Sequence, residues 1–314
     1  MDLQNAKIAV VGIGGVGGYL AGMLCSAYPN VTLVARNKRK EKIENDGLVL
    51  HSDYNGEITA KPKRVCLADE LEPQDFIFVC VKNYSLEAVC DQIGGAVDEN
   101  TIIIPVMNGV DPGDRIRKRM GTKRVVDSLI YIVSFVNSDF SVTQQGNFAK
   151  LFIGIQNASE TERKMAENVS YILKGANIDN EVSDDIEAQI WRKYILNCAY
   201  NVATAYYDQT IGQLRDDKIK SLNYEMLVWE AYSVCKAKNI NLPQKDVDHI
   251  IYKFYNEHAY DSTSSLMRDY RDGSKNTELE TFCGYIVREA EKYGIHVPLT
   301  RGMYDELLQK TAKN

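Results

Sequence analysis

Short apolar segments rich in β-branched residues alternate with stretches of helical periodicity along the first part of the chain. The first segment runs from Lys7 to Val11, and a glycine cluster separates it from a helical pattern over Gly18 to Ala27. A second apolar segment, Val31 to Ala35, follows directly. This order of strand, helix and strand predicts a parallel βαβ unit, because two parallel strands need a crossover of about this length.

The same alternation continues beyond this unit. Strands are predicted over Asp75 to Val81 and Thr101 to Pro105, and helices over Ser85 to Ile93 and after Asp111. Repeated alternation of this kind favours an α/β fold built on a doubly wound parallel sheet.

Two stretches of this region depart from the alternation. The segment from Gly47 to Cys66 has the pattern of hairpin-like excursions. The segment from Arg124 to Ile155 is rich in Val, Ile, Phe and Thr, with turn residues at Asn137 to Asp139 and Gln144 to Asn147. We expect it to form antiparallel strands that are appended to the same sheet.

The hydrophobic pattern changes near residue 184. A helix from about Ser159 to Lys174 and a short strand ending at Val182 come first, and nearly all that follows has helical periodicity. We therefore predict two domains, residues 1–184 with the sheet and residues 185–314 as a second, all-helical C-terminal domain. The helices expected there are Asp184 to Ala205, Asp217 to Lys238, Pro243 to Ala259 and Thr277 to Tyr293.

Composition and charge exclude several classes of function. The 314 residues carry a net charge of −6 and no long basic stripe, so neither nucleic acid nor an anionic membrane is an expected partner. The seven cysteines are scattered without a CxxC pair, and the four histidines show no metal-ligand spacing. We expect a cytoplasmic protein with reduced thiols and no metal site.

The glycine cluster has the spacing GxGxxG between the first strand and the first helix. Gly12 permits a tight turn, Gly14 lets the backbone approach a pyrophosphate, and Gly17 lets helix and strand pack closely. Amide groups at the helix N-terminus would favour a phosphate. We predict a Rossmann-type dinucleotide site contacted by Gly12, Gly14, Gly15, Val16 and Gly17.

The residues after the second strand indicate which dinucleotide binds. An NAD site usually offers Asp or Glu to the ribose hydroxyls here, whereas this chain has Arg36 and no carboxylate through Lys40. A guanidinium can stack on adenine and pair with a 2′-phosphate, so we predict NADPH. Lys38, Arg39 and Lys40 are interpreted as the solvated basic start of a helix.

Two later strand ends should face the same crevice, because ligands of such sheets bind outside the carboxyl ends of the strands. Lys82 follows one predicted strand and Asn108 follows the next. We expect both beside the nicotinamide and the substrate, although each alone could be a polar loop residue.

The first helix of the second domain carries a polar stripe on an otherwise apolar sequence. Lys193, Asn197, Asn201 and Thr204 are spaced by four, four and three residues, which places them on one face. Periodicity alone leaves two interpretations open, a solvated face or a buried stripe that needs partners.

The chain resembles the ketopantoate reductase (2-dehydropantoate 2-reductase) family over its whole length. The resemblance rests on the GxGxxG, Arg36, Lys82, the Asn108-Gly109 turn, the Trp191-Arg192-Lys193 helix with Asn197, Asn201 and Thr204-Ala205, and the segment Ser264 to Asp269 followed by Thr277-Glu278. By this resemblance Lys193 matches the catalytic lysine and Glu278 its acidic partner. Asn108, Asn197, Asn201 and Ser265 match substrate-binding positions.

Two residues and the length of one interval differ from the family pattern. Val202 stands where the family usually has proline, Leu266 where it has methionine, and the interval from Asp269 to Glu278 is one residue longer. These changes leave the proposed reaction centre intact. They leave open the pocket for the side chain of the substrate.

The resemblance implies NADPH-dependent reduction of ketopantoate to (R)-pantoate in pantothenate biosynthesis. Hydride transfer places negative charge on the carbonyl oxygen, which an ammonium can stabilise and protonate. Buried between the domains, Lys193 would have its pKa lowered by desolvation, while Glu278 would hold it charged.

Two alternatives stay open. One is an NAD(P)-dependent D-2-hydroxy acid dehydrogenase acting on another branched or aromatic 2-oxo acid, and the other is a non-catalytic NADPH sensor. The expected partner is thus a small 2-oxo acid. A helical domain can offer a face for a homodimer, but no heptad or exposed stripe identifies one in the sequence.

Overall fold

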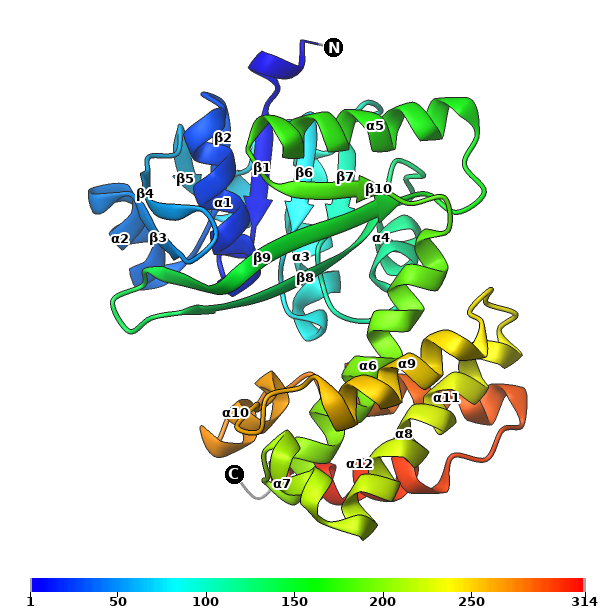
Figure 1. Ribbon diagram of the computed structural model, residues 1–314. Coiled ribbons are helices and arrows are strands. Elements are labelled where there is room, and N and C mark those ends of the chain that lie inside the picture. The colour runs from blue at the N-terminus through cyan, green and yellow to red at the C-terminus, as the bar shows by residue number, and fades with distance from the viewer. Residues whose placement is uncertain (1, 313–314) are drawn as a thin grey trace. The chain divides into compact units, whose positions relative to one another are not determined.

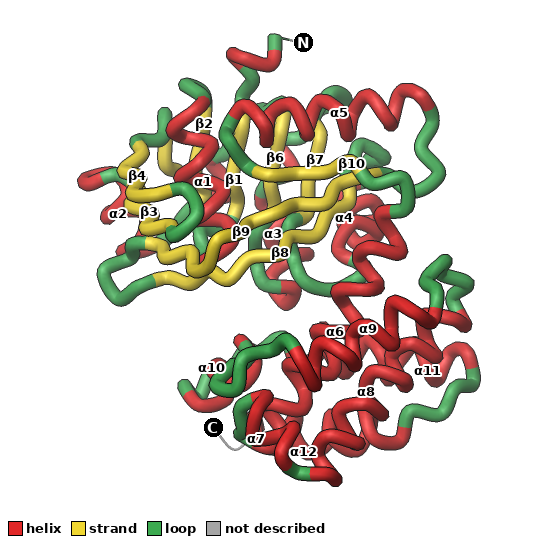
Figure 2. Tube along the Cα trace, in the orientation of Figure 1, coloured by secondary structure: helices red, strands yellow, loops and turns green. Residues whose placement is uncertain are grey.

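The computed structural model describes residues 2–312, and the chain divides into two compact units (Figure 1). They are Met1–Ile186 and Glu187–Asn314, so the division falls at residue 186, against 184 in the sequence-based prediction. All strands belong to the first unit, and the regular structure of the described part of the second unit is helical (Figure 2). The α/β fold with a parallel sheet and a helical C-terminal domain is confirmed.

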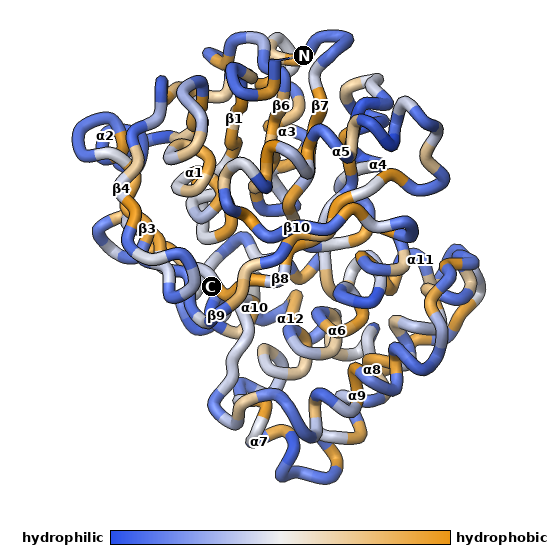
Figure 3. Tube along the Cα trace, turned by 45° about the horizontal axis from the view of Figure 1, so that its top comes forward, coloured by the Kyte–Doolittle hydropathy of each residue, from blue (hydrophilic) through white to orange (hydrophobic). Residues whose placement is uncertain are grey.

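A five-stranded parallel sheet forms the centre of the first unit. Its strand order is β5-β2-β1-β6-β7, and Ile8 of β1 pairs with Val31 on one side and Phe76 on the other. The central strands consist of hydrophobic residues (Figure 3), and successive residues are all buried, as expected for strands covered by other layers on each side. The strands are β1 (Ile8–Val11), β2 (Val31–Val34), β5 (Arg64–Cys66), β6 (Phe76–Val79) and β7 (Ile102–Pro105).

A second sheet of mixed direction lies in the same unit. Its order is β10-β9-β3-β4, with β8 antiparallel to β9. The strands predicted over Arg124 to Ile155 are antiparallel, but they belong to this second sheet, so the prediction that they extend the first sheet is wrong. The hairpin β3–β4 is present as expected. The strands are β3 (Leu48–Ser52), β4 (Gly56–Ala60), β8 (Asp127–Val136), β9 (Val142–Gly154) and β10 (Asp179–Val182).

Helix α1 (Gly15–Ala27) packs between the two sheets, which explains its many glycines. A Cβ atom at Gly17 would collide with the Gly12 carbonyl oxygen beside β1, and one at Gly18 would collide with Val142 of β9. These two successive glycines, which face different sides of α1, therefore let both sheets approach the helix closely. A helix apolar all round is buried in this way, because it has no face left for solvent.

The remaining helices of the first unit complete its cores. Leu86 of α3 and Ile116 of α4 belong to the cluster on one face of the parallel sheet, whereas Val169 of α5 belongs to the cluster with α1 and the second sheet. Residues such as Val10 and Val11 alternate between these clusters, as successive strand residues must. The helices are α2 (Asn37–Asp46), α3 (Leu86–Gln92), α4 (Pro112–Met120) and α5 (Glu160–Gly175).

The second unit is a bundle of helices with one short π-helical segment. Within residues 2–312, no helix of either unit is long and apolar enough to cross a membrane. Nor does a group of three or more His, Cys, Asp and Glu side chains in that range form a potential metal site. The elements are α6 (Ile186–Tyr207), α7 (Ile211–Asp216), α8 (Lys218–Ala237), α9 (Gln244–Asn256), α10 (Ser265–Arg271), the π-helical segment η5 (Glu280–Gly284), α11 (Tyr285–Tyr293) and α12 (Pro298–Ala312).

A buried carboxylate joins two of these helices. Glu230 of α8 accepts hydrogen bonds from the backbone N–H groups of Leu299 (3.0 Å) and Thr300 (2.7 Å) in the first turn of α12. The side chain thus satisfies two amides that an isolated helix leaves without partners, and its charge suits the helix dipole.

We expect Glu230→Ala to lower the free energy of unfolding by about 2–4 kcal/mol, because it leaves one buried and one partly buried amide without an acceptor. Urea denaturation of the full chain, followed by far-UV circular dichroism, measures this loss. Glu257→Ala, at an exposed carboxylate of the same unit, is the matched control. Equal stability of the two variants would contradict the role of Glu230.

Candidate functional site

The three glycines of the GxGxxG turn meet three different steric conditions. Gly12 has φ +92°, and a Cβ atom there would lie 2.8 Å from the Val81 side chain. Gly17 leaves no room for a Cβ atom beside the Gly12 carbonyl, whereas nothing lies within 4 Å of the Cβ position of Gly14. The turn is therefore tight at its first glycine, closely packed at its third and open at its second, where a pyrophosphate would approach.

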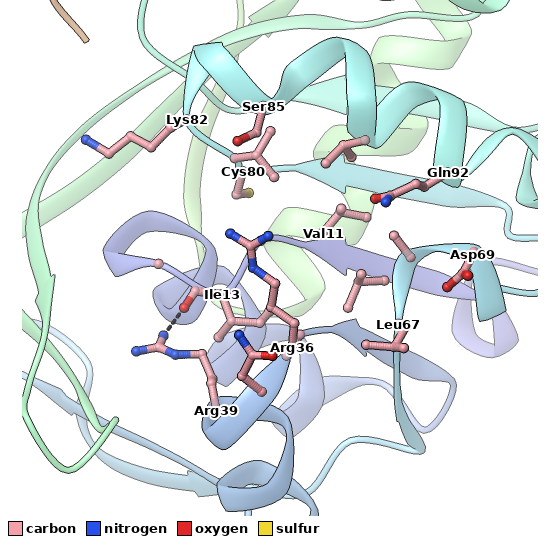
Figure 4. Close-up of a pocket in the computed structure, with 18 of the residues that line it drawn as sticks. Val11, Ile13, Arg36, Arg39, Leu67, Asp69, Cys80, Lys82, Ser85 and Gln92 are labelled. Atoms are coloured by element: carbon pink, nitrogen blue, oxygen red, sulfur yellow. Dashed lines mark hydrogen bonds between the residues drawn. The ribbon is translucent and has the colours of Figure 1, made fainter. Parts of the chain in front are cut away.

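A cavity of about 910 Å³ lies at the carboxyl ends of β1, β2 and β6 (Figure 4). Gly12 and Gly14 line it, whereas Gly15, Val16 and Gly17 lie in the first turn of α1 and are not among its lining residues. Its position is the crevice where open α/β sheets bind ligands. The other lining residues used below are Ile13, Arg36, Arg39, Asp69, Lys82 and Phe140.

Arg36 directly precedes α2 and points into this cavity (Figure 4). Its side chain is exposed, and no carboxylate in the described part of the chain pairs with it. Asp69, which follows β5, is the acidic residue of the cavity lining. The sequence prediction missed Asp69, because it considered the residues after β2, whereas Asp69 follows β5, the strand next to β2.

Arg39 departs from its sequence interpretation. It is half-buried rather than solvated, lines the cavity, and donates a hydrogen bond to the Ile13 carbonyl (Figure 4). Lys40 is also half-buried, but it is outside the cavity lining and pairs with Glu44 one turn further along α2. The two adjacent cations of this helix thus have different surroundings.

Lys82 and Asn108 follow β6 and β7, as predicted. Lys82 is exposed and lines the cavity, whereas Asn108 is half-buried and outside the lining. The Asn108 loop is held by a residue that the sequence analysis did not single out, since Asn83 Nδ2 donates to the Asn108 carbonyl (2.7 Å). Arg115 in turn donates to the Asn83 side-chain oxygen (3.0 Å) and carbonyl (2.9 Å). The two strand ends are therefore fixed to each other.

Lys193 of the second unit has a strongly shifted pKa, and Glu278 is its acidic neighbour. Desolvation lowers the pKa of Lys193 to about 8, and the nearby Glu278 carboxylate opposes that shift. Lys193 is half-buried on α6, and Glu278 is only 4% exposed just before the π-helical segment. A lysine with its pKa near neutrality can give up and regain a proton readily.

A hydrogen bond and an aromatic contact fix the chain around Lys193 and Glu278. Tyr194 Oη donates to the Thr281 carbonyl at 2.6 Å, which ties α6 to the π-helical segment that follows Glu278. Trp191 packs edge-on against Tyr194, with ring centroids 5.5 Å apart, and both rings are buried. Lys193 lies between these two residues in sequence, so its backbone has little freedom to move.

The polar stripe of α6 is largely buried and bonded. Asn201 donates to the Asn197 carbonyl (3.0 Å), and its side-chain oxygen accepts from Ser265 Oγ (3.2 Å) and from the Leu266 amide (3.3 Å). Thr204 donates to Ser264 Oγ at 2.7 Å. The structure thus brings the predicted residues Asn201 and Ser265 together, and it resolves the open interpretation of the stripe in favour of a partnered one for Asn201 and Thr204.

The parallel sheet, the glycine turn and the adjoining cavity define a dinucleotide-binding protein. A family profile described as ketopantoate reductase PanE/ApbA matches residues 8–158, and its C-terminal counterpart matches residues 185–311. The chain belongs to this family, whose members are NAD(P)H-dependent oxidoreductases that act on CH–OH groups.

Individual relatives cover nearly the whole chain at low identity. An uncharacterized oxidoreductase, YkpB of Bacillus subtilis, is 25% identical over 301 residues, which are 96% of this chain and 97% of the relative. The crystal structure of a PanE/ApbA family ketopantoate reductase from Ralstonia eutropha has a TM-score of 0.88 and 26% identity, covering 98% and 99% of the two chains. A D-mandelate dehydrogenase, solved with NADH and anilino(oxo)acetate, has a TM-score of 0.87 at 21% identity, with the same coverage, and shares the fold.

Proposed function

We propose that this protein reduces ketopantoate to (R)-pantoate with NADPH, a step of pantothenate biosynthesis. The observation that carries the proposal is the Lys193–Glu278 pair, a desolvated lysine beside a buried carboxylate in the helical unit of a chain of this family. A lysine in such surroundings can act as a proton donor, and membership of the family indicates the class of substrate.

The residues of the cavity fit NADPH. The open space at Gly14 can admit a pyrophosphate, and Arg36 offers a guanidinium without a protein counter-ion where the adenosine ribose binds in such sheets. Gly12, Gly14, Arg36 and Lys82 would hold the dinucleotide. When bound, its reduced nicotinamide supplies a hydride to the carbonyl carbon of the substrate.

The protein's own residues would manage charge and protons at the carbonyl oxygen. The Lys193 ammonium stabilises the developing negative charge and transfers one proton to that oxygen, so the ketone becomes an alcohol. Glu278 keeps the lysine charged before the reaction. Asn108, Asn197 and Ser265 are proposed to orient the substrate, with Asn201 fixing Ser265.

This role predicts how reduction depends on pH. The acid form of Lys193 is the active one, so kcat/KM for reduction should stay level below pH 8 and fall about tenfold per unit above it. The reverse oxidation, which needs the neutral amine, should show the opposite limb. The measurement is the steady-state rate of reduction with saturating NADPH, recorded between about pH 6 and pH 10.

A matched variant tests whether the fall of kcat/KM at high pH reflects the titration of Lys193. Glu278→Gln removes the charge that opposes desolvation, so the midpoint of the limb should move to lower pH. An unmoved midpoint in Glu278→Gln would assign the limb to another group and contradict this mechanism.

The substrate is tested by following NADPH oxidation with ketopantoate beside a panel of branched and aromatic 2-oxo acids. A clear preference for ketopantoate supports the proposal. A preference for another 2-oxo acid would make the protein a D-2-hydroxy acid dehydrogenase that uses the same lysine. No oxidation with any of them would overturn the enzymatic role and favour the sensor.

A further inference from the structure

Arg39 has contacts that its position on a basic helix does not require. It lies in the first turn of α2, yet its guanidinium turns back to donate to the carbonyl of Ile13, inside the glycine-rich turn (Figure 4). An arginine side chain has five N–H donors in a planar fork, so this bond leaves other donors beside the cavity.

An aromatic ring from the second sheet holds this guanidinium. The Arg39 guanidinium carbon lies 5.4 Å from the centroid of the Phe140 ring, which also lines the cavity. Phe140 has φ +69°, an unfavourable conformation for a bulky residue. Its amide donates to the Asn137 carbonyl (3.0 Å), and the Asn137 amide donates to the Ser141 carbonyl (2.9 Å). The turn between β8 and β9 thus keeps a strained residue in place against Arg39.

The charge of Arg39 has no acidic partner among residues 2–312. Burial lowers its pKa, and no neighbouring carboxylate offsets that effect. Several other arginines of the unit are paired with carboxylates, as Arg115 is with Glu87 (2.7 Å) and Arg119 with Asp91 (2.5 Å). A half-buried cation without a counter-ion is costly, which favours an anionic ligand in the cavity that it lines.

We propose that Arg39 is a second residue that binds the 2′-phosphate of the dinucleotide, with Phe140 fixing its orientation. The proposal rests on the proposed use of NADPH. Arg36 and Arg39 flank the first turn of one helix, directly after β2, where the adenosine ribose binds in this kind of sheet. Two guanidinium groups there would enclose one phosphate from two sides, as Arg-rich phosphate sites do.

Binding of NADPH and NADH to the full chain tests this role. Arg39→Met should weaken NADPH about tenfold to a hundredfold, the usual effect of losing one charged hydrogen-bonding group, and leave NADH unchanged. Lys42→Met is the matched control, because Lys42 lies on the same helix, pairs with Asp46 at 2.7 Å and is outside the cavity lining. Phe140→Leu should weaken NADPH in the same selective way but less.

Two nucleotide fragments separate this proposal from the proposed reductase activity. The affinity ratio of 2′,5′-ADP to 5′-AMP, measured by calorimetry, needs no turnover, so it depends only on the 2′-phosphate. A lower ratio in Arg39→Met supports the assignment even if ketopantoate is not the substrate. An equal loss for both fragments would mean that Arg39 only braces the glycine turn, and no loss would mean that it does not contact the ligand. Either result overturns the proposal.

Discussion

Replacing Lys193 by alanine is expected to lower kcat for reduction by about a hundredfold to a thousandfold, the usual effect of losing one well-placed electrostatic donor. The dissociation constant of NADPH should not change, because the residues that line the dinucleotide cavity all belong to the first unit. Rapid-mixing kinetics give the rate, and fluorescence titration with NADPH gives the binding constant.

The control for this variant is Lys218→Ala. Lys218 is an exposed lysine of the same unit, at the start of α8, so its loss changes the net charge equally without touching the pair. It should keep normal turnover. Near-normal turnover in Lys193→Ala itself would show that another group protonates the substrate and would contradict the mechanism.

Much of the fold could be predicted because its signals are local. The apolar strands Ile8–Val11 and Phe76–Val79 each precede a helix, and this order alone specifies parallel pairing. The second sheet could not be predicted in the same way. The turn predicted at Gln144 to Asn147 lies inside the single strand β9 (Val142–Gly154), so that prediction is wrong. The partners β3 and β10 of this strand are distant in sequence, and no local pattern indicates which sheet it joins.

The candidate site shows the same limit at the level of side chains. The spacing of Gly12, Gly14 and Gly17 predicts three steric conditions, and each is present in the structure. By contrast, Arg39 looks like any solvated residue of a basic helix. In the structure it is half-buried, and the Phe140 ring beside it comes from the turn between β8 and β9, so only the tertiary structure reveals these surroundings.

The stripe on α6 is an intermediate case. Its periodicity predicts that Asn201 needs a hydrogen-bond partner if the stripe is buried. In the structure Asn201 is buried. The partners are Ser265 Oγ and the Leu266 amide at the start of α10, a helix that the sequence analysis did not predict. Seven residues are too few for a clear hydrophobic period, so that element was missed.

Replacing Arg36 by glutamate is expected to weaken NADPH binding by about a hundredfold or more. The change removes a charged hydrogen-bond donor, worth about 1.5–3 kcal/mol, and adds repulsion between a carboxylate and the 2′-phosphate. NADH should bind as well as before or better, because a carboxylate at this strand end can accept hydrogen bonds from ribose hydroxyls. The measurement is the ratio of the dissociation constants of NADPH and NADH at one ionic strength, compared between Arg36→Glu and the unchanged protein.

Two further variants separate loss of attraction from gain of repulsion. Arg36→Gln removes the charge without adding a carboxylate, so its loss of NADPH affinity should be intermediate. Lys42→Glu makes the same charge reversal on an exposed turn of α2 and should change neither dinucleotide. If Arg36→Glu weakened NADPH and NADH equally, the guanidinium would act on a group common to both, and the predicted preference for NADPH would lose its structural basis.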